Sequence, residues 1–351
     1  MTDLLRSPAT PFLLVDVALL TANVTAMARF ARDRGLALRP HGKTHKCAEI
    51  GRLQVDSGAC GLTVATVSEA EAFAGEGITD LFVAYPLWVD AAKGARLRDL
   101  AERATVMVGV DSLEGARALA AQVPGSSVLV EVDCGQHRSG VQPSQAGLVA
   151  ESAARAGLDV RGVFTFPGHS YAPGAAAAVA AQEAAALRTA VESVSARGIE
   201  VRVVSGGSTP SAADVDAGVL TEMRPGVYVF GDAQQWELGS IAPERIALTC
   251  PATVVSRAGG NLVLDAGSKA LGANRAGYAT GHGRLIDHPQ ARIPHLSEHH
   301  AVVSWDGSVP PELGSRLRVV PNHVCTAVNL TDELVLTDGT AWRVIARGAN
   351  T

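Results

Sequence analysis

The distribution of apolar residues divides this chain of 351 residues into stretches of different texture. Residues 17–34 carry apolar side chains at the spacing of an amphipathic helix, and Gly35 marks its end. Beyond this helix, short apolar runs alternate with helix-like segments for roughly 200 residues, a pattern typical of parallel βαβ units. The helix-like segments include 68–77, 91–103, 112–122, 145–156 and 174–196. The runs predicted as strands are 36–40, 61–66, 81–85, 104–110, 126–132, 160–166, 199–204 and 226–230. This number of strands favours a (β/α)8 TIM barrel, an α/β fold, over an open sheet.

After about residue 246 the chain turns to short β-like runs without a long amphipathic helix. These runs, at 253–255, 261–264, 316–320 and 333–336, are separated by turn signals such as Gly259-Gly260 and Asp338-Gly339. The apolar segment TPFLLVD at 10–16 precedes the first helix and can join the same sheet. We therefore predict an N-terminal strand within 1–16, a barrel over 17–246 and a C-terminal β domain over 247–351.

Composition narrows the classes of function. The net charge is −5 and aromatic residues make up 4% of the chain, which disfavours a nucleic-acid partner that needs basic surfaces and stacking rings. The five cysteines are scattered, which indicates reduced thiols rather than a disulfide framework. No stretch has the pattern of a signal peptide or a membrane span. We expect a cytoplasmic protein with no membrane partner and a small-molecule substrate.

The densest group of reactive side chains is RPHGKTHK at 39–46, at the end of the first predicted barrel strand. It contains Arg39, His41, Lys43, His45 and Lys46. Neighbouring positive charge disfavours protonation of a lysine, and a neutral lysine amine is a nucleophile that forms Schiff bases. A solvated basic loop that binds phosphate or nucleic acid is the alternative that this stretch leaves open.

Polar and reactive side chains recur where the predicted strands end, which is where TIM barrels place their active sites. The loop SGGSTPS at 205–211 combines adjacent glycines with small hydroxyl residues, so that backbone amides can approach an anion. It lacks the Walker A pattern, and therefore suits a single phosphate group better than a nucleoside triphosphate. A tight turn before a helix is the other interpretation. The residues at the strand ends are Lys43, Thr66, Tyr85, Asp111, Asp133 with Arg138, His169 and Ser205-Gly206-Gly207.

The segment PNHVC at 321–325 places His323 and Cys325 two positions apart. In a strand the two side chains would point to the same face, and imidazole plus thiolate is half of a zinc site. A buried cysteine beside a hydrogen-bonded histidine is the alternative. His295, His299 and His300 have the pattern of loop histidines.

A Schiff-base lysine, a phosphate loop and a barrel together point to pyridoxal 5′-phosphate. A set of segments, in order along nearly the whole chain, makes this more specific: TPFLLVD at 10–16, RPHGKTHK at 39–46, VSEAEAF at 67–73, EVDCGQHRSGV at 131–141, FPGHSY at 166–171, SGGSTPS at 205–211, TEMRPGVYVFGD at 221–232, LDAGSKA at 264–270 and PNHVCTAVNLTD at 321–332. Through them the chain resembles the fold-type III pyridoxal-phosphate enzymes of the D-threonine aldolase and D-serine dehydratase family. The motifs RPH-x-K-x-HK and P-x-H-x-C are the most specific.

The resemblance implies a role for each matching residue. Lys43 would hold the cofactor covalently, and Arg138 would lie near the cofactor ring hydroxyl. His41 and His45, which flank Lys43 in the sequence, are the candidates for groups that tune the lysine, and His41 is predicted to contact the cofactor. The residues that would bind the phosphate are Gly206, Gly207, Ser208, Thr209 and Tyr228.

For the substrate side, the resemblance implies that His169 and Tyr171 line the pocket. His323 and Cys325 would hold a divalent metal, zinc or manganese, beside the substrate hydroxyl. The family architecture is a barrel followed by a β domain, and it implies a homodimer.

The implied activity is that of a lyase on 3-hydroxy-D-amino acids. The leading expectation is retro-aldol cleavage of a D-threonine-like substrate to glycine and an aldehyde, with His169 or a metal-bound water as the base. The alternative is a D-serine or D-threonine dehydratase that forms a 2-oxo acid and ammonia, with Lys43 removing the α-proton. Cys325 is the ligand type of the dehydratase branch, whereas the following TAVNLTD is closer to the aldolase pattern. The His-x-Cys pair argues against an amino-acid racemase, and the large C-terminal domain argues against a non-catalytic cofactor carrier.

Overall fold

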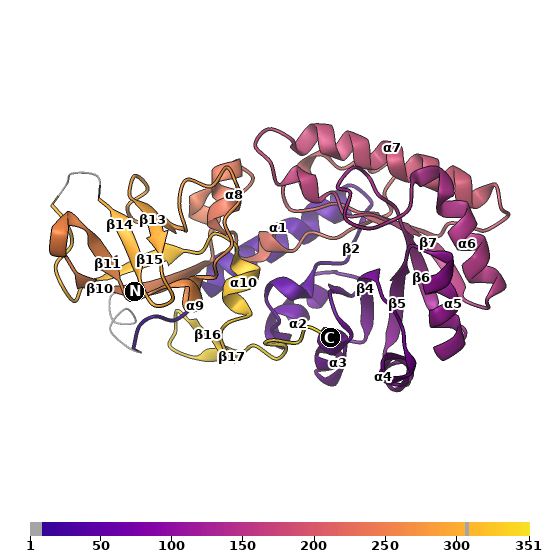
Figure 1. Cartoon of the computed structure of the whole chain (residues 1–351), viewed down its shortest axis with the longest axis horizontal. Coiled ribbons are helices and arrows are strands. Elements are labelled where there is room, and N and C mark those ends of the chain that lie inside the picture. The colour runs from indigo at the N-terminus through magenta and orange to yellow at the C-terminus, as the bar shows by residue number, and fades with distance from the viewer. Residues whose placement is uncertain (1–8, 306–308) are drawn as a thin grey trace. The chain divides into compact units, whose positions relative to one another are not determined.

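The computed structural model describes residues 9–305 and 309–351 and divides the chain into two compact units (Figure 1). The β unit comprises the described parts of Met1–Thr25, Thr44–Glu49 and Val227–Gly348. The barrel unit comprises Ala26–Lys43, Ile50–Gly226 and Ala349–Thr351. Each unit is therefore assembled from segments that are far apart in the sequence.

Parallel strands form the sheet of the barrel unit. Their order is β2-β9-β8-β7-β6-β5-β4-β3, and a parallel bridge between His41 and Thr63 links the two ends of this series. This arrangement confirms the predicted TIM-like fold class. The strands are β2 (Ala37–Leu38), β3 (Leu62–Val64), β4 (Asp80–Pro86), β5 (Thr105–Val110), β6 (Ser127–Glu131), β7 (Asp159–Phe164), β8 (Val203–Gly206) and β9 (Glu222–Met223).

Helices α3 to α7 lie outside these strands (Figure 1). Thr66, Asp90 and Ser112 cap α3, α4 and α5, each accepting a backbone amide three residues on. The barrel interior is apolar where Phe82, Leu129 and Phe164 meet. Across the described residues, no helix is both long enough and apolar enough to span a lipid bilayer. The longer helices of the chain are α1 (Val17–Asp33), α2 (Ala48–Asp56), α3 (Val67–Gly75), α4 (Ala91–Ala101), α5 (Leu113–Gln122), α6 (Ala146–Arg155) and α7 (Ala176–Ser195).

The last barrel strand is not where the apolar pattern places it. Residues 226–230, predicted as a strand, contain the 3-10 helix η6 (Val227–Val229). The last strand of this sheet along the sequence is instead β9, which pairs with β8 and β2. This strand carries Glu222, a buried carboxylate that accepts hydrogen bonds from Arg39 Nε at 2.7 Å and from Ser205 Oγ at 2.6 Å. Glu222 is thus buried by pairing with Arg39, whereas a strand found from its apolar pattern would carry an apolar side chain at such a buried position.

We expect Glu222→Gln to lower the free energy of unfolding by about 3 kcal/mol, because it leaves the buried Arg39 guanidinium without its buried counter-charge. Asp80, the other carboxylate bonded to Arg39, is partly exposed and compensates only in part. Denaturant unfolding followed by circular dichroism measures the change. Glu200→Gln, which removes an exposed carboxylate from the same unit, is the control. Equal unfolding midpoints for the two variants would refute this role of the ion pair.

The β unit contains a mixed sheet in the order β11-β14-β13-β12-β15-β10-β1-β16-β17. β1 pairs antiparallel with β10 and parallel with β16, so the strand before the first helix lies inside this sheet. Short helices α8 (Ala233–Leu238), α9 (Ser268–Leu271) and α10 (Val324–Val328) complete the unit. Its strands are β1 (Leu14–Val15), β10 (Leu248–Ser256), β11 (Leu262–Leu264), β12 (Arg284–Leu285), β13 (Arg292–Leu296), β14 (Ala301–Ser304), β15 (Arg316–Val320), β16 (Glu333–Leu336) and β17 (Ala341–Arg343).

The last three residues return to the barrel unit, at the start of α3. The Ser68 amide donates to Thr351 O at 2.8 Å, and Thr66 Oγ1 donates to Ala349 O at 2.8 Å. The end of the chain is thereby fixed to the same helix that Thr66 caps.

Candidate functional site

Lys43 and Arg138 both lie near one aromatic ring at the carboxyl ends of the barrel strands. Lys43 lies in the 3-10 helix η2 (Gly42–Thr44), just after β2. Its Nζ is 5.7 Å from the centroid of the Phe166 ring, and Arg138 Cζ is 5.3 Å from the same centroid. Both distances are within the range of cation–π contact. The structure therefore brings two residues that are distant in sequence to one aromatic ring.

A tight turn after β6 positions Arg138. Asp133 Oδ1 accepts the amides of Gly135 at 2.9 Å and His137 at 3.0 Å, and His137 adopts the left-handed conformation with φ of 57°. Although burial opposes it, these hydrogen bonds lower the pKa of Asp133 and keep it ionised. A left-handed conformation in a residue other than glycine is uncommon, and here the turn enforces it directly before Arg138.

The loop after β8 forms a buried polar cradle. Gly207 has φ of +79°, a conformation that favours glycine. Ser208 is 1% exposed, and its Oγ lies 2.8 Å from both Ser170 Oγ and Ser211 Oγ. Within residues 9–305 and 309–351, the Ser208 amide donates to no protein group. A buried amide and hydroxyl of this kind fit an anionic group such as a phosphate.

His169 lies in the 3-10 helix η4 (Gly168–Ser170), on the same loop as Phe166 and Tyr171. Its Nε2 is 2.9 Å from Gln182 Oε1 on α7. Because an amide oxygen only accepts, Nε2 carries the proton and Nδ1 has a lone pair. His169 Nδ1 is buried and has no hydrogen-bond partner among the described residues. The Phe166 and Tyr171 ring centroids are 6.5 Å apart.

His323 and Cys325 lie in the β unit, in a local structure that differs from the prediction. The expectation of a strand at PNHVC is wrong, because His323 is the N-terminal cap of α10 and Cys325 lies in its first turn. The buried Asp232 carboxylate accepts the Val324 amide at 3.2 Å and so holds the start of this helix.

The His323 imidazole is nevertheless directed at Cys325 and Asp232. The interaction with Cys325, and then that with Asp232, raises the pKa of His323 well above its ordinary value although burial opposes this. Asp232 Oδ2 is 3.4 Å from His323 Nδ1, an arrangement that leaves Nε2 as the nitrogen for a metal. In the part of the chain that the structure describes, no group of three or more His, Cys, Asp or Glu side chains is placed to hold a metal ion. The pair fits zinc as a half-site, with other ligands needed to complete it.

The remaining predicted residues are divided between the units. His41 lies beside Lys43 in the barrel unit, and Thr209 follows Ser208 in the cradle. Tyr228, in η6, belongs to the β unit, and so do His323 and Cys325 at the start of α10. That these three share one site with Lys43 remains a prediction.

Sequence reasoning missed a buried arginine at the same strand ends. Arg224 follows β9, and its Nε donates to Ser205 Oγ at 2.8 Å while its Nη2 donates to Thr165 O. Its guanidinium lies 5.3 Å from the Phe164 ring centroid, and burial lowers its pKa although Glu222 opposes this. The signal was present in TEMRP, where a correctly placed β9 puts this arginine at a strand end.

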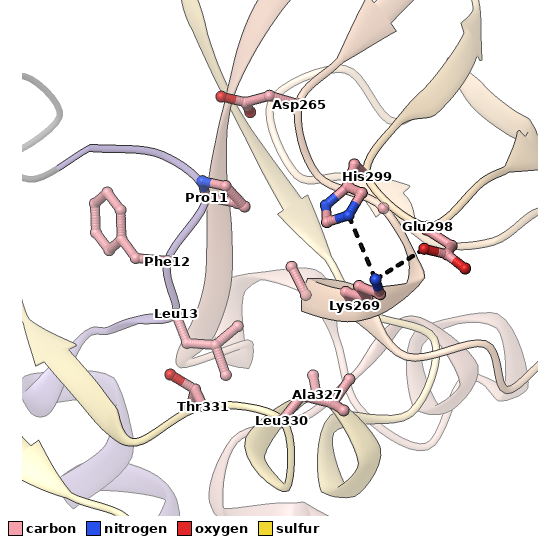
Figure 2. Close-up of a pocket in the computed structure, with 12 residues that line it drawn as sticks. Pro11, Phe12, Leu13, Asp265, Lys269, Glu298, His299, Ala327, Leu330 and Thr331 are labelled. Atoms are coloured by element: carbon pink, nitrogen blue, oxygen red, sulfur yellow. Dashed lines mark hydrogen bonds and ion pairs between the residues drawn. The ribbon is translucent and has the colours of Figure 1, made fainter.

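The β unit also holds a separate cavity of about 260 Å³ (Figure 2). At its wall Lys269 Nζ is 2.8 Å from Glu298 Oε2 and 3.5 Å from His299 Nε2. Pro11, Phe12 and Leu13 form another side of it (Figure 2). None of the residues predicted to bind cofactor or metal lines this cavity.

Comparison with known proteins agrees with this organisation. Residues 15–234 match the alanine racemase N-terminal domain, and residues 247–337 match a serine dehydratase domain. D-threonine aldolase from Arthrobacter sp. is 35% identical over 99% of this chain and 94% of its own length. D-threo-3-hydroxyaspartate dehydratase from Delftia sp. (strain HT23) is 33% identical over 93% of each chain.

A solved structure extends the likeness to three dimensions. A cysteine-to-alanine mutant of D-threo-3-hydroxyaspartate dehydratase, described as the metal-free form, superposes with a TM-score of 0.89 and 30% identity, over 97% of this chain and 98% of that one. The strand-end cluster, the buried cradle and the matches over both parts of the sequence lead to one assignment. The chain belongs to the fold-type III pyridoxal-phosphate family in which an alanine racemase N-terminal domain is joined to a serine dehydratase domain.

Proposed function

We propose that this protein is a pyridoxal-phosphate- and metal-dependent lyase that cleaves 3-hydroxy-D-amino acids of the D-threonine type to glycine and an aldehyde. The observation that carries the proposal is the meeting of Lys43 and Arg138 at the Phe166 ring. A primary amine and a fixed cation at the strand ends of a TIM-like barrel are what attachment of an anionic aldehyde cofactor requires. The 35% identity to a D-threonine aldolase over 99% of the chain supports the reaction type.

The barrel residues fit pyridoxal phosphate. Lys43 would hold it covalently, Arg138 would face its ring hydroxyl, and the Gly207–Ser208 cradle would hold its phosphate. When bound, the cofactor supplies an electron sink for the bond that breaks at Cα of the substrate.

His169 is suited to remove the proton from the substrate 3-hydroxyl. Gln182 fixes the Nε2 proton, and the buried Nδ1 lone pair has no other partner among the described residues. A buried, unpaired imidazole nitrogen is ready to act as a general base. Tyr171, on the same loop, would line the substrate side.

His323 and Cys325 would hold the metal, with Asp232 orienting the imidazole. The metal would supply Lewis acidity at the substrate hydroxyl. A related dehydratase has been solved as a cysteine mutant in a metal-free form, which supports a metal-binding cysteine in this family.

The second candidate is dehydration of D-serine, D-threonine or a similar substrate to a 2-oxo acid and ammonia. The thiol at Cys325 and the 33% identity to a dehydratase over 93% of the chain favour it. In that reaction Lys43 would take the α-proton and the hydroxyl would leave.

Product analysis distinguishes these reactions. We expect the purified protein, supplied with pyridoxal phosphate and Zn²⁺ or Mn²⁺, to convert D-threonine to glycine and acetaldehyde and to leave L-threonine unchanged. Chromatography of the amino acids and an aldehyde assay measure the products.

A 2-oxo acid and ammonia as the only products from D-threonine and D-serine would replace the proposal with the dehydratase. Conversion of D-alanine to L-alanine without cleavage of D-threonine would replace it with a racemase.

A further inference from the structure

A buried carboxyl group lies directly behind the cradle at residues 206–209. Glu183 on α7 is 0% exposed, and its Oε1 accepts the Gly207 amide at 2.7 Å. A Cβ on Gly206 would lie 2.4 Å from the same oxygen, so the carboxyl occupies the space that a side chain there would fill. Glu183 is thus part of the cradle, although it takes no part in the proposed chemistry.

The second oxygen of this carboxyl is unsatisfied. Glu183 Oε2 is buried and has no hydrogen-bond partner among the described residues. An ionised carboxylate in such a position carries a large desolvation cost, whereas a protonated carboxyl carries much less. Burial raises the pKa of Glu183 to about 7, although the Gly207 amide and Arg224 oppose this. The group therefore changes protonation near neutral pH.

The charged and titratable groups around Glu183 leave it sensitive to an added anion. Arg224 is the cation that acts on it, and Arg224 is shared with Glu131 and Glu222. The Cys134 thiol also faces Glu183, and burial raises the pKa of this thiol to about 11, so it stays neutral. His169 is hydrogen-bonded to Gln182, the residue before Glu183 on α7. The other charged groups on the elements packed against α7 do not contribute to the pKa of Glu183: Glu151, Arg155, Asp159, Arg161 and Asp214.

We propose that Glu183 is a proton-coupled positioning residue of the phosphate cradle: it takes up one proton from solvent when a phosphate dianion binds next to Gly207. This inference rests on the proposed function, which places the cofactor phosphate at residues 206–209. A phosphate monoester carries nearly two negative charges near pH 7. An ionised Glu183 accepts the Gly207 amide, directly beside the place proposed for the phosphate, and its negative charge would repel the phosphate. Protonation removes the repulsion while the carboxyl oxygen still accepts the Gly207 amide.

The test uses pyridoxine 5′-phosphate, which carries the ring and the phosphate but no aldehyde, so that it does not react with Lys43. Its affinity for the full chain freed of cofactor is measured by calorimetry between pH 6 and pH 9. We expect the dissociation constant of the unaltered protein to rise above pH 7 by up to about tenfold per pH unit relative to Glu183→Gln, which mimics the protonated group. Glu192→Gln, an exposed change of the same type on the same helix, should behave as the unaltered protein.

Proton uptake gives an independent reading. Calorimetry in two buffers of different ionisation enthalpy at pH 8 should show about one more proton taken up by the unaltered protein than by Glu183→Gln. Pyridoxine without phosphate should show no such difference. If Glu183→Gln does not fold, infrared difference spectra of the unaltered protein should show a protonated carboxyl band that forms when the ligand binds.

The outcomes separate this inference from the proposed function. Binding with the same pH dependence and the same proton uptake in the unaltered protein and in Glu183→Gln, or no carboxyl band on binding, would overturn the role of Glu183 alone. Failure of the unaltered protein to bind pyridoxal phosphate at all would overturn both.

Discussion

Replacement of Lys43 by alanine is expected to abolish the visible absorption of the cofactor and to lower turnover by on the order of 10³-fold or more. The reason is that Lys43 is the amine at the strand ends, near the Phe166 ring that Arg138 also contacts. Without it the cofactor has no covalent attachment, and in the dehydratase reaction the α-proton has no base. Absorption spectra of the purified variant and steady-state kinetics with D-threonine measure the two effects.

Lys93→Ala is the matched control, because Lys93 lies on α4 and its Nζ donates to the exposed Trp88 carbonyl rather than to any residue proposed for the site. Its spectrum and turnover should match those of the unaltered protein. A visible spectrum that persists in Lys43→Ala would contradict the assignment of Lys43, whatever the activity of that variant.

Replacement of His323 or Cys325, the proposed metal ligands, should lower turnover but leave the cofactor absorption in place. We expect His323→Ala and Cys325→Ala each to lower turnover by on the order of 10²-fold or more, since removal of even an outer partner of a metal ligand costs 10–100-fold. The visible absorption should remain, because neither His323 nor Cys325 is among the residues proposed to hold the cofactor. Treatment of the unaltered protein with a chelator should reproduce the loss, and added Zn²⁺ or Mn²⁺ should reverse it.

The exposed His300 provides a control in the same unit. His300→Ala should keep full turnover and the same response to chelation. Full activity of the unaltered protein after exhaustive metal removal would contradict the metal requirement and would leave His169 as the base to be tested.

The sequence predicted the fold class well where apolar side chains define the elements. β4 to β7 follow apolar runs that lie close to the predicted ranges. The closing strand β9 could not be found in this way, because Glu222 within it is buried by pairing with Arg39 rather than by being apolar. Pairing between strands that are far apart in sequence leaves no local pattern to read.

The same limit applies to the candidate site. Lys43, Arg138 and His169 were identified because reactive side chains at strand ends are conspicuous in a sequence. Glu183 was not, because it lies within an alanine-rich helix and becomes part of the site only through its contact with Gly207. His323 and Cys325 were identified by their spacing. The helix α10 that begins at these residues is held by Asp232, which lies 91 positions before His323 in the sequence and could not be linked to it from a local pattern.

The docking of residues 349–351 onto the start of α3 also bears on how the protein is made. Synthesis proceeds from the first residue to the last, and independent domains commonly fold in that order as they emerge. Here the β unit needs residues up to Gly348 and the barrel unit needs Ala349–Thr351. The last segments of both units therefore emerge from the ribosome almost together, after the rest of both units. Neither unit can therefore finish folding until nearly all of the other has been synthesised.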